Sequence, residues 1–219
     1  MPRRKIPFEE GQYYHIYNRG NNRGAIFFEP ENYLFFLQRW RKYLSASFDV
    51  IAYVLMPTHY HFLVRVKMDI KSSEFLKNSE LLDENSELSP IEITPVISNA
   101  MQRFGISYTR AINKRFDRVG SLFQGAYQAK LIQSEAHLLH LCRYIHGNPV
   151  KDGLVADPAD WQYSNYLEWI GEREGTLLDL EFVHAYFASP ADYRQFLLEN
   201  LRGRNLPDDI KLYLDNLET

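Results

Sequence analysis

The sequence is poor in cysteine and has no long apolar run, and each absence excludes a class of protein. Cys142 is the only cysteine among 219 residues, which excludes an internal disulfide framework and any cysteine-rich zinc site. No stretch is long enough to span a bilayer, and no apolar segment follows the N-terminal MPRRKIPFEEG that could act as a secretory signal. The sequence therefore predicts a cytoplasmic protein with no membrane contact.

The composition is that of a folded protein with strongly segregated charge. Hydrophobic residues make up 45% of the chain and aromatic residues 15%, which favours a globule over a disordered chain. The net charge of −3 conceals two basic blocks, +5 over residues 1–67 and +6 over residues 101–151, alternating with acidic ones, −5 over 68–100 and −9 over 152–219. This alternation predicts a cationic patch suited to phosphate groups, although solvated helix faces would give the same counts.

Residue patterns predict an α+β fold with one antiparallel sheet. Strands are expected at 11–20, 48–56, 59–66 and 121–132, and helices at 30–44, 94–116 and 134–149. Ser134 is a candidate N-cap of the last helix. The order β-α-β-β-α-β-α is the ferredoxin-like pattern with one added helix. Residues 68–92 are expected to form a polar loop, and we expect a division between a domain of residues 1–165 and a helical, acidic extension of residues 166–219.

The segment MPTHYHFLV places two histidines in an otherwise apolar strand. Alternate residues of a strand point to the same face, so His59 and His61 project together while Tyr60 points away. Two adjacent imidazoles can share one divalent metal ion, and a third ligand is then needed. The alternative is a pair of packed histidines without a metal.

The segment CRYIHGNPV supplies a second candidate pair near the end of the last helix. Tyr144 and Asn148 are four residues apart, so a phenol and an amide oxygen share one helix face. An amide oxygen can coordinate a hard cation. Taken alone, the pair is better explained by a packed tyrosine, one of 15 in the chain, and an ordinary helix end before Pro149.

Together the two segments resemble the single-tyrosine HUH transposases, and in particular the REP-associated tyrosine transposases of the IS200-like group. Supporting matches are YNRGNNRGAIFFEPENYLFFL near the start, LFQGAYQAKLI before the tyrosine helix and WQYSNY after it. The resemblance covers about residues 11–166. It implies a ferredoxin-like fold with the histidine strand central to the sheet, His59 and His61 as metal ligands, Tyr144 as nucleophile and Asn148 as the third ligand.

The activity implied by the resemblance is metal-dependent cleavage and rejoining of single-stranded DNA at hairpin-forming repeats, through a 5′-phosphotyrosine and with Mg²⁺ or Mn²⁺. A monomer or a homodimer is compatible with the family. We expect DNA contacts from basic and polar residues in the early turn, on the long helix and near the tyrosine, namely Arg19, Arg23, Arg103, Arg110, Lys114, Arg115, Gln124 and Arg143. Tyr13 and Tyr17 could stack on unpaired bases, whereas alternation turns Tyr14 to the opposite face.

Three other readings are compatible with parts of the pattern. The first is a non-cleaving protein that binds DNA or RNA hairpins on the same fold, which has no need of His59, His61, Tyr144 and Asn148 together. The second is another HUH nuclease, such as a replication initiator or relaxase, which the YIHGNPV context disfavours. The third is a structural protein whose histidine pair is merely packed.

Overall fold

The computed structural model describes residues 7–68, 70, 93–177 and 179–201. Within them, four strands form one sheet in the order β2-β3-β1-β4, and every neighbouring pair is antiparallel. The strands are β1 (Tyr13–Arg19), β2 (Phe48–Met56), β3 (His59–Val66) and β4 (Gln128–Ile132). The predicted α+β class with an antiparallel sheet is confirmed. The predicted loop at 68–92 lies almost entirely outside the described residues.

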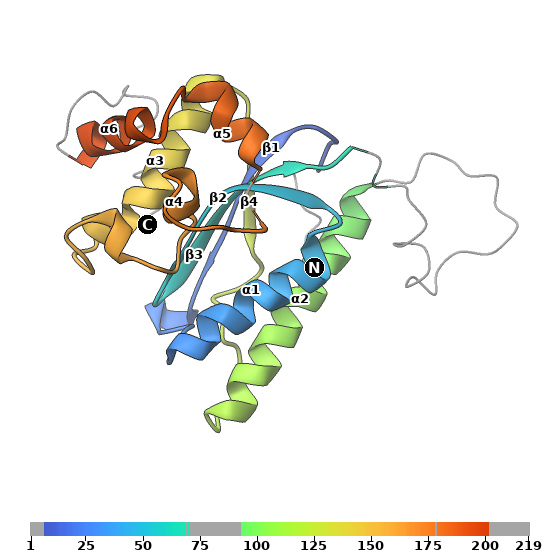
Figure 1. Cartoon of the computed structure of the whole chain (residues 1–219). Helices are drawn as coiled ribbons and strands as arrows, with labels where there is room; N and C mark the ends of the chain where they lie inside the picture. Colours follow the sequence, from blue (N-terminus) through green and yellow to red (C-terminus); the bar gives the residue numbers. More distant parts are fainter. Residues whose placement is uncertain (1–6, 69, 71–92, 178, 202–219) are drawn as a thin grey trace, which may run out of the picture.

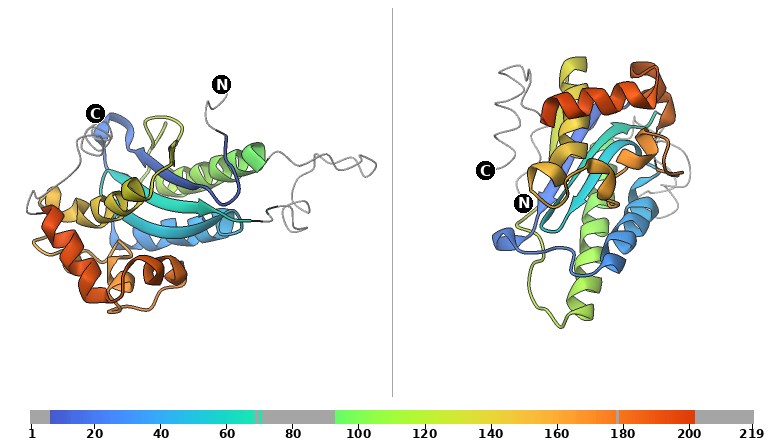
Figure 2. Two further views of the ribbon diagram at one scale, coloured as in Figure 1. Left: turned by 90° about the horizontal axis from the view of Figure 1, so that it is seen from above. Right: turned by 60° about the vertical axis from the view of Figure 1, so that its left-hand side comes forward.

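In the described part of the chain, six α-helices cover the two faces of this sheet (Figure 1). They are α1 (Pro30–Leu44), α2 (Ile93–Arg115), α3 (Glu135–Lys151), α4 (Tyr166–Trp169), α5 (Leu180–Tyr186) and α6 (Pro190–Leu201), with short 3₁₀ helices η1 (Asn21–Arg23) and η3 (Pro158–Asp160). Helices α1 and α2 lie side by side on one face, and α3 with the later helices lies on the other (Figures 1 and 2). None of the described helices is both long and apolar enough to cross a membrane.

Strand alternation decides which side chains of β3 meet which helices. Tyr60, Phe62 and Val64 enter the core shared with α1 and α2. There the Trp40 and Phe62 rings stack with centroids 3.7 Å apart. Leu63 belongs to the second core, beneath α3. His59 and His61, four and two residues before Leu63, therefore face the α3 side.

Strand β4 is shorter than predicted. The sequence predicted a strand from 121 to 132, but only Gln128–Ile132 pairs as one. Residues before it pair instead with the turn after β1, through the Gly20–Phe123 bridge and the hydrogen bond from Asn21 N to Leu122 O. The regular strand begins only at Gln128, so the predicted first half of the strand was wrong.

Helix α3 begins as predicted and runs slightly further. The Ser134 side chain accepts a hydrogen bond from the backbone N–H of His137, which caps the helix. The helix continues through Pro149 to Lys151. Only residues 133 and 134 join β4 to α3, so the helix must turn back at once and lie against the sheet.

The described part of the C-terminal extension shares a core with α3. Trp169 and Tyr193 are both buried there, with ring centroids 4.2 Å apart. Figure 2 shows α6 lying across α3. The division at residue 165 stays a prediction, because this shared packing does not by itself mark a boundary.

Candidate active site

The two histidines of β3 stand next to β1 on the face of the sheet that α3 covers. In the register of the sheet, His61 lies opposite Tyr17 and His59 opposite Arg19. The two imidazole centroids are 5.1 Å apart, and the ring planes are nearly perpendicular at 83°. His61 is 4% exposed, whereas His59 is partly exposed at the start of the strand. The hydroxyl of Thr58 lies 3.0 Å from His59 Nδ1.

A third histidine, which the sequence analysis did not single out, joins this pair. His15 of β1 is fully buried, and its Nε2 lies 2.9 Å from Nδ1 of His61. The two rings are stacked with centroids 5.1 Å apart, and Tyr17 stacks on His15 at 4.8 Å. Alternation along β1 places His15 and Tyr17 on one face, which was readable from the sequence, but their meeting with His61 depends on strand pairing. Tyr14 is buried on the other face, as expected.

Tyr144 lies directly beside His61. The two ring centroids are 5.7 Å apart with an interplanar angle of 83°, an edge-to-face contact between α3 and β3. The Tyr144 side chain is 6% exposed. Lys151, two turns later on α3, places its ammonium nitrogen 5.7 Å from the centroid of the Tyr144 ring. The predicted meeting of the phenol with the imidazoles is therefore present in the structure.

Asn148 lies one helical turn beyond Tyr144, and the topology carries it towards His59. Strands β3 and β4 run in the same direction because both are antiparallel to β1, and α3 returns against them (Figure 1). Four residues advance a helix by about 6 Å, close to the rise of two strand residues from His61 back to His59. Asn148 is 3% exposed, and its Nδ2 is a buried donor without a hydrogen-bond partner in the described residues.

Burial keeps the imidazoles of this cluster neutral. It lowers the pKa of His59 to about 4, with the nearby charge of Arg19 as a second cause. It lowers the pKa of His61 well below its ordinary value, with His15, His59 and Arg19 adding to the effect. A neutral imidazole has a nitrogen lone pair free for a metal ion, so the cluster is in the protonation state that ligation requires.

The donor set of this cluster is two imidazoles and one amide. In the described part of the chain, no group of three or more His, Cys, Asp or Glu side chains has metal-binding geometry. A metal held by His59 and His61 would thus need a protein ligand of another type. Asn148, which is buried on α3, is a chemically suitable one, because amide oxygens bind hard divalent cations.

A buried polar network centred on His146 joins α3 to the rest of the protein. His146 Nε2 lies 2.9 Å from Asn165 Oδ1, and His146 Nδ1 lies 2.5 Å from the Tyr193 hydroxyl. Asn165 also accepts from the Tyr53 backbone N–H and donates to Ile51 O, which joins it to β2. His146 is therefore a buried structural residue that joins the tyrosine helix to both the sheet and α6.

The predicted DNA contacts are spread over more than one surface. Arg19 faces the same side as His59, and Gln124 is exposed beside it, with its backbone N–H bonded to Arg19 O. Arg23 is exposed in η1. The four cations of α2 lie along a helix on the far face of the sheet, from Arg103 beside Tyr43 to Arg115 paired with Glu29.

Arg143 occupies a different environment from the other predicted DNA contacts. It is 4% exposed, and its guanidinium lies 4.5 Å from the centroid of the Phe196 ring of α6. Two of its nitrogens, Nε and one terminal nitrogen, are buried without a hydrogen-bond partner in the described residues. The structure therefore does not bring Arg143 to the surface where a DNA strand could reach it.

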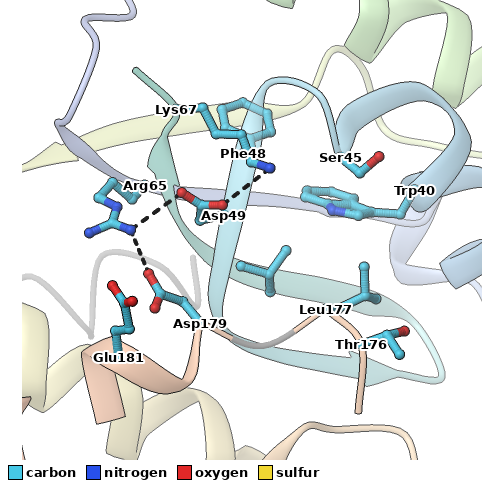
Figure 3. A pocket seen from close by; sticks show the side chains of 11 residues that line it. Trp40, Ser45, Phe48, Asp49, Arg65, Lys67, Thr176, Leu177, Asp179 and Glu181 are labelled. Atoms are coloured by element: carbon cyan, nitrogen blue, oxygen red, sulfur yellow. Dashed lines mark hydrogen bonds and ion pairs between the residues drawn. The ribbon is translucent and has the colours of Figure 1, made fainter. Parts of the chain in front are cut away.

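A pocket of about 380 Å³ lies at the other end of β3 (Figure 3). Arg65 bridges Asp49 and Asp179 in its wall, and Lys67 pairs with Asp49. Trp40 and Leu177 supply apolar lining. The pocket is lined by none of the histidines and does not include Tyr144, so it is separate from the candidate site.

No family model matches the chain, and no curated protein matches it in sequence. Similar solved structures include the following three. A REP-associated tyrosine transposase bound to a REP hairpin matches with a TM-score of 0.56 and 17% identity, over 82% of this chain and 94% of that one. A Deinococcus radiodurans R1 protein provisionally named a transposase matches with a TM-score of 0.37 and 14% identity, over 67% and 97%.

The third is a bacterial tRNA(His) guanylyltransferase-like protein in complex with GTP, with a TM-score of 0.38 and 8% identity, over 70% of this chain and 73% of that one. Only the first of the three is close enough in shape to support an argument, and at 17% identity the argument concerns the fold. The resemblance to the REP-associated tyrosine transposases, first seen in the histidine and tyrosine segments, is thus confirmed by a shared fold over most of the chain.

Proposed function

We propose that the protein is a transposase-like enzyme that cleaves and rejoins single-stranded DNA with Tyr144 as nucleophile. The observation that carries the proposal is the contact between Tyr144 and His61, 5.7 Å between ring centroids, with His59 adjacent and Asn148 one turn further. The similar fold of a REP-associated tyrosine transposase bound to a REP hairpin supports the same reading. The strand order β2-β3-β1-β4 supports a ferredoxin-like scaffold of the HUH type.

The residues present fit a divalent metal ion, Mg²⁺ or Mn²⁺. His59 and His61 would hold it through imidazole nitrogens, and Asn148 through its amide oxygen. The lowered pKa of His59 supports this role, because a neutral imidazole can give its lone pair to a metal ion. When bound, such an ion supplies positive charge to a non-bridging oxygen of the scissile phosphate.

The protein's own groups account for the rest of the chemistry. The Tyr144 oxygen attacks phosphorus and loses its proton, the bond from phosphorus to the 3′ oxygen breaks, and that oxygen leaves as a 3′-hydroxyl. A 5′-phosphotyrosine remains. Attack by the 3′-hydroxyl of a second strand reverses the step and releases the phenol, so no nucleotide cofactor is consumed. The Lys151 ammonium, 5.7 Å from the centroid of the Tyr144 ring, places a positive charge over its face.

We propose that the DNA enters at the end of the sheet where β3 begins. Arg19, Arg23 and Gln124 gather there, and Lys114 and Arg115 lie at the matching end of α2. The connection from η1 reinforces this arrangement, because Ile26 N bonds to Pro57 O in the β2–β3 turn. The proposed substrate is a hairpin-forming repeat flanked by a short single-stranded segment.

The test is formation of a covalent adduct. The full-length protein is incubated with 5′- and 3′-labelled single-stranded hairpin DNA, with and without Mg²⁺ or Mn²⁺, and separated on a denaturing gel. We expect a metal-dependent protein–DNA adduct carrying the label 3′ to the cut, and its loss in Tyr144→Phe. Tyr127→Phe is the matched control and should retain the adduct. An adduct that persists in Tyr144→Phe would assign the nucleophile elsewhere.

A non-cleaving hairpin-binding protein is the second candidate function. The same incubation separates the two, because a binding protein would shift the hairpin on a native gel without forming an adduct. Metal dependence of binding alone would not favour it over the nuclease.

A further inference from the structure

We propose that His15 is a positioning residue that holds the proton of His61 on Nδ1, so that Nε2 of His61 presents a lone pair to the metal site. The inference rests on the proposed function for the identity of the metal ligand. It concerns a buried side chain that no motif of the resemblance assigns. His15, Tyr17 and His61 form a stack of three rings on this face of the sheet.

The imidazoles of His15 and His61 are placed so that a single proton lies between their facing nitrogens. His15 Nε2 and His61 Nδ1 are 2.9 Å apart and fully inside the protein, so one nitrogen must donate and the other accept. If His61 donates, its Nε2 is free of hydrogen and can ligate. If His15 donates, Nδ1 of His61 accepts, its proton moves to Nε2, and ligation through Nε2 is blocked.

The surroundings of the pair favour the first arrangement. No other hydrogen bond in the described part of the chain engages His61, so only Nε2 remains to face Tyr144 and the partly exposed His59. Metal-ligating histidines generally donate their second ring nitrogen to a partner that fixes the tautomer, usually a carboxylate, carbonyl or water. Here another imidazole takes that role.

The ring stack explains why His15 is rigid enough for this purpose. Tyr17 packs on His15 at 4.8 Å and on His61 at 5.8 Å, and the three planes are within 27° of one another. Each ring is mounted on a paired strand residue, and Tyr17 lies directly opposite His61 in the sheet. The acceptor is therefore fixed relative to the ligand by backbone pairing and needs no flexible side chain.

The experiment reads the tautomer directly. Long-range ¹H–¹⁵N correlation spectra of the metal-free protein, with histidines assigned by substitution, report which nitrogen of His61 carries the proton. We expect Nδ1–H in the wild type and in His15→Gln, whose amide oxygen can accept, and a changed or mixed tautomer in His15→Leu. A proton on Nε2 of His61 in the wild-type protein would overturn the inference.

Binding of Mn²⁺, measured by calorimetry or by the electron paramagnetic resonance of free Mn²⁺, provides the second readout. We expect a loss of roughly 10- to 100-fold in affinity for His15→Leu, the range typical of outer-shell partners, and recovery of most of it in His15→Gln. Tyr17→Phe, which keeps the stack, is the matched control and should bind like the wild type. Circular dichroism establishes that each variant is folded.

The two proposals fail in different ways. If the wild-type protein does not bind Mn²⁺, or binds it unchanged after His59→Ala, the proposed metal-dependent nuclease is wrong, while the tautomer spectra still decide the role of His15. If Mn²⁺ binds and depends on His59 but His15→Leu binds it as tightly with an unchanged tautomer, the positioning role is wrong and the proposed function stands.

Discussion

The edge of the Tyr144 ring faces His61, with 5.7 Å between ring centroids and 83° between ring planes. The contact joins α3 to the inner strand β3, and Tyr144 is buried, with 6% of its side chain exposed. If Tyr144 is the nucleophile, as proposed, its position beside His61 before substrate binds means that little reorganisation is needed when the phosphate arrives.

Removing the Tyr144 hydroxyl should abolish formation of the covalent adduct without weakening DNA binding. Tyr144→Phe keeps the buried ring, so we expect hairpin affinity within about 2-fold of wild type and unfolding free energy within about 1 kcal/mol, the usual range for a conservative change. Gel shift and denaturant unfolding measure these, alongside the adduct assay. Binding lost together with the adduct would mean that the hydroxyl contacts the DNA ground state.

Truncating the histidine ligands should separate metal binding from folding. His59 is partly exposed, so His59→Ala should weaken Mn²⁺ binding strongly at little cost in stability. His61→Ala should weaken Mn²⁺ binding and also destabilise the fold. It removes the hydrogen bond to the buried His15 Nε2, at a cost of about 1–3 kcal/mol. Calorimetric titration and thermal melts of the two variants distinguish these effects. Equal stability losses would argue against the buried hydrogen bond.

Acid should destabilise the protein well before its carboxylates titrate. Burial lowers the pKa of His15 to about 3, of His59 to about 4 and of His146 to about 4, and each has an unfolded value near 6.5. These histidines are neutral when folded, so their stabilisation is present above pH 6.5 and is lost as pH falls towards 4. Each contributes a slope of about 1.4 kcal/mol per pH unit in that window.

Urea unfolding between pH 7.5 and 4 measures this slope in the metal-free protein. His146→Gln, which retains hydrogen-bonding capacity, should reduce the slope while leaving that of the other histidines in place. A free energy of unfolding that is flat from pH 6.5 to 4.5 would show that the buried imidazoles accept protons without cost.

The Tyr193 hydroxyl of α6 should stabilise α3 through its hydrogen bond to His146. It lies 2.5 Å from Nδ1 of His146, while its ring packs on Trp169. Tyr193→Phe keeps the ring and removes the donor, so we expect a loss of about 1–3 kcal/mol and faster amide exchange in α3 and α6. Tyr186→Phe on α5 is the control. Faster exchange confined to α6 would show that the network does not reach α3.

The effect of charge reversal on hairpin binding should depend on where along α2 the residue lies. Lys114 lies at the end near the start of β3, whereas Arg103 lies about 16 Å away along the axis, beside Tyr43. Lys114→Glu should therefore weaken hairpin binding and reduce the salt slope by about 0.7–0.9 per lost phosphate contact, with a smaller effect from Arg103→Glu. Equal effects would extend the DNA path over the whole helix.

Local sequence patterns brought out the candidate site residues themselves but not the neighbouring residues that contact them. Strand alternation placed His59 and His61 on one face of β3, and helical spacing placed Tyr144 and Asn148 on one face of α3. Both predictions were possible because the periods are short and the elements are regular. The role of His15 was missed because it arises from the register between β1 and β3, which no local pattern encodes.

Two other differences have the same non-local origin. Residues 121–127 have strand composition but pair with the turn after β1, so β4 is short. Arg143 was expected to contact DNA from its position beside Tyr144, but α6 covers it, since Phe196 lies over its guanidinium. Helix packing of this kind depends on residues about fifty positions away.

Asn165 binds the edge strand β2 and the tyrosine helix at once, and the residues directly after it complete the apolar layer beneath α3. A shortened chain that stops at residue 165 would leave Cys142, Ile145 and the outer side of β2 open to water. We therefore expect such a fragment to aggregate when expressed alone, so that biochemical work on this protein requires the longer polypeptide from the outset.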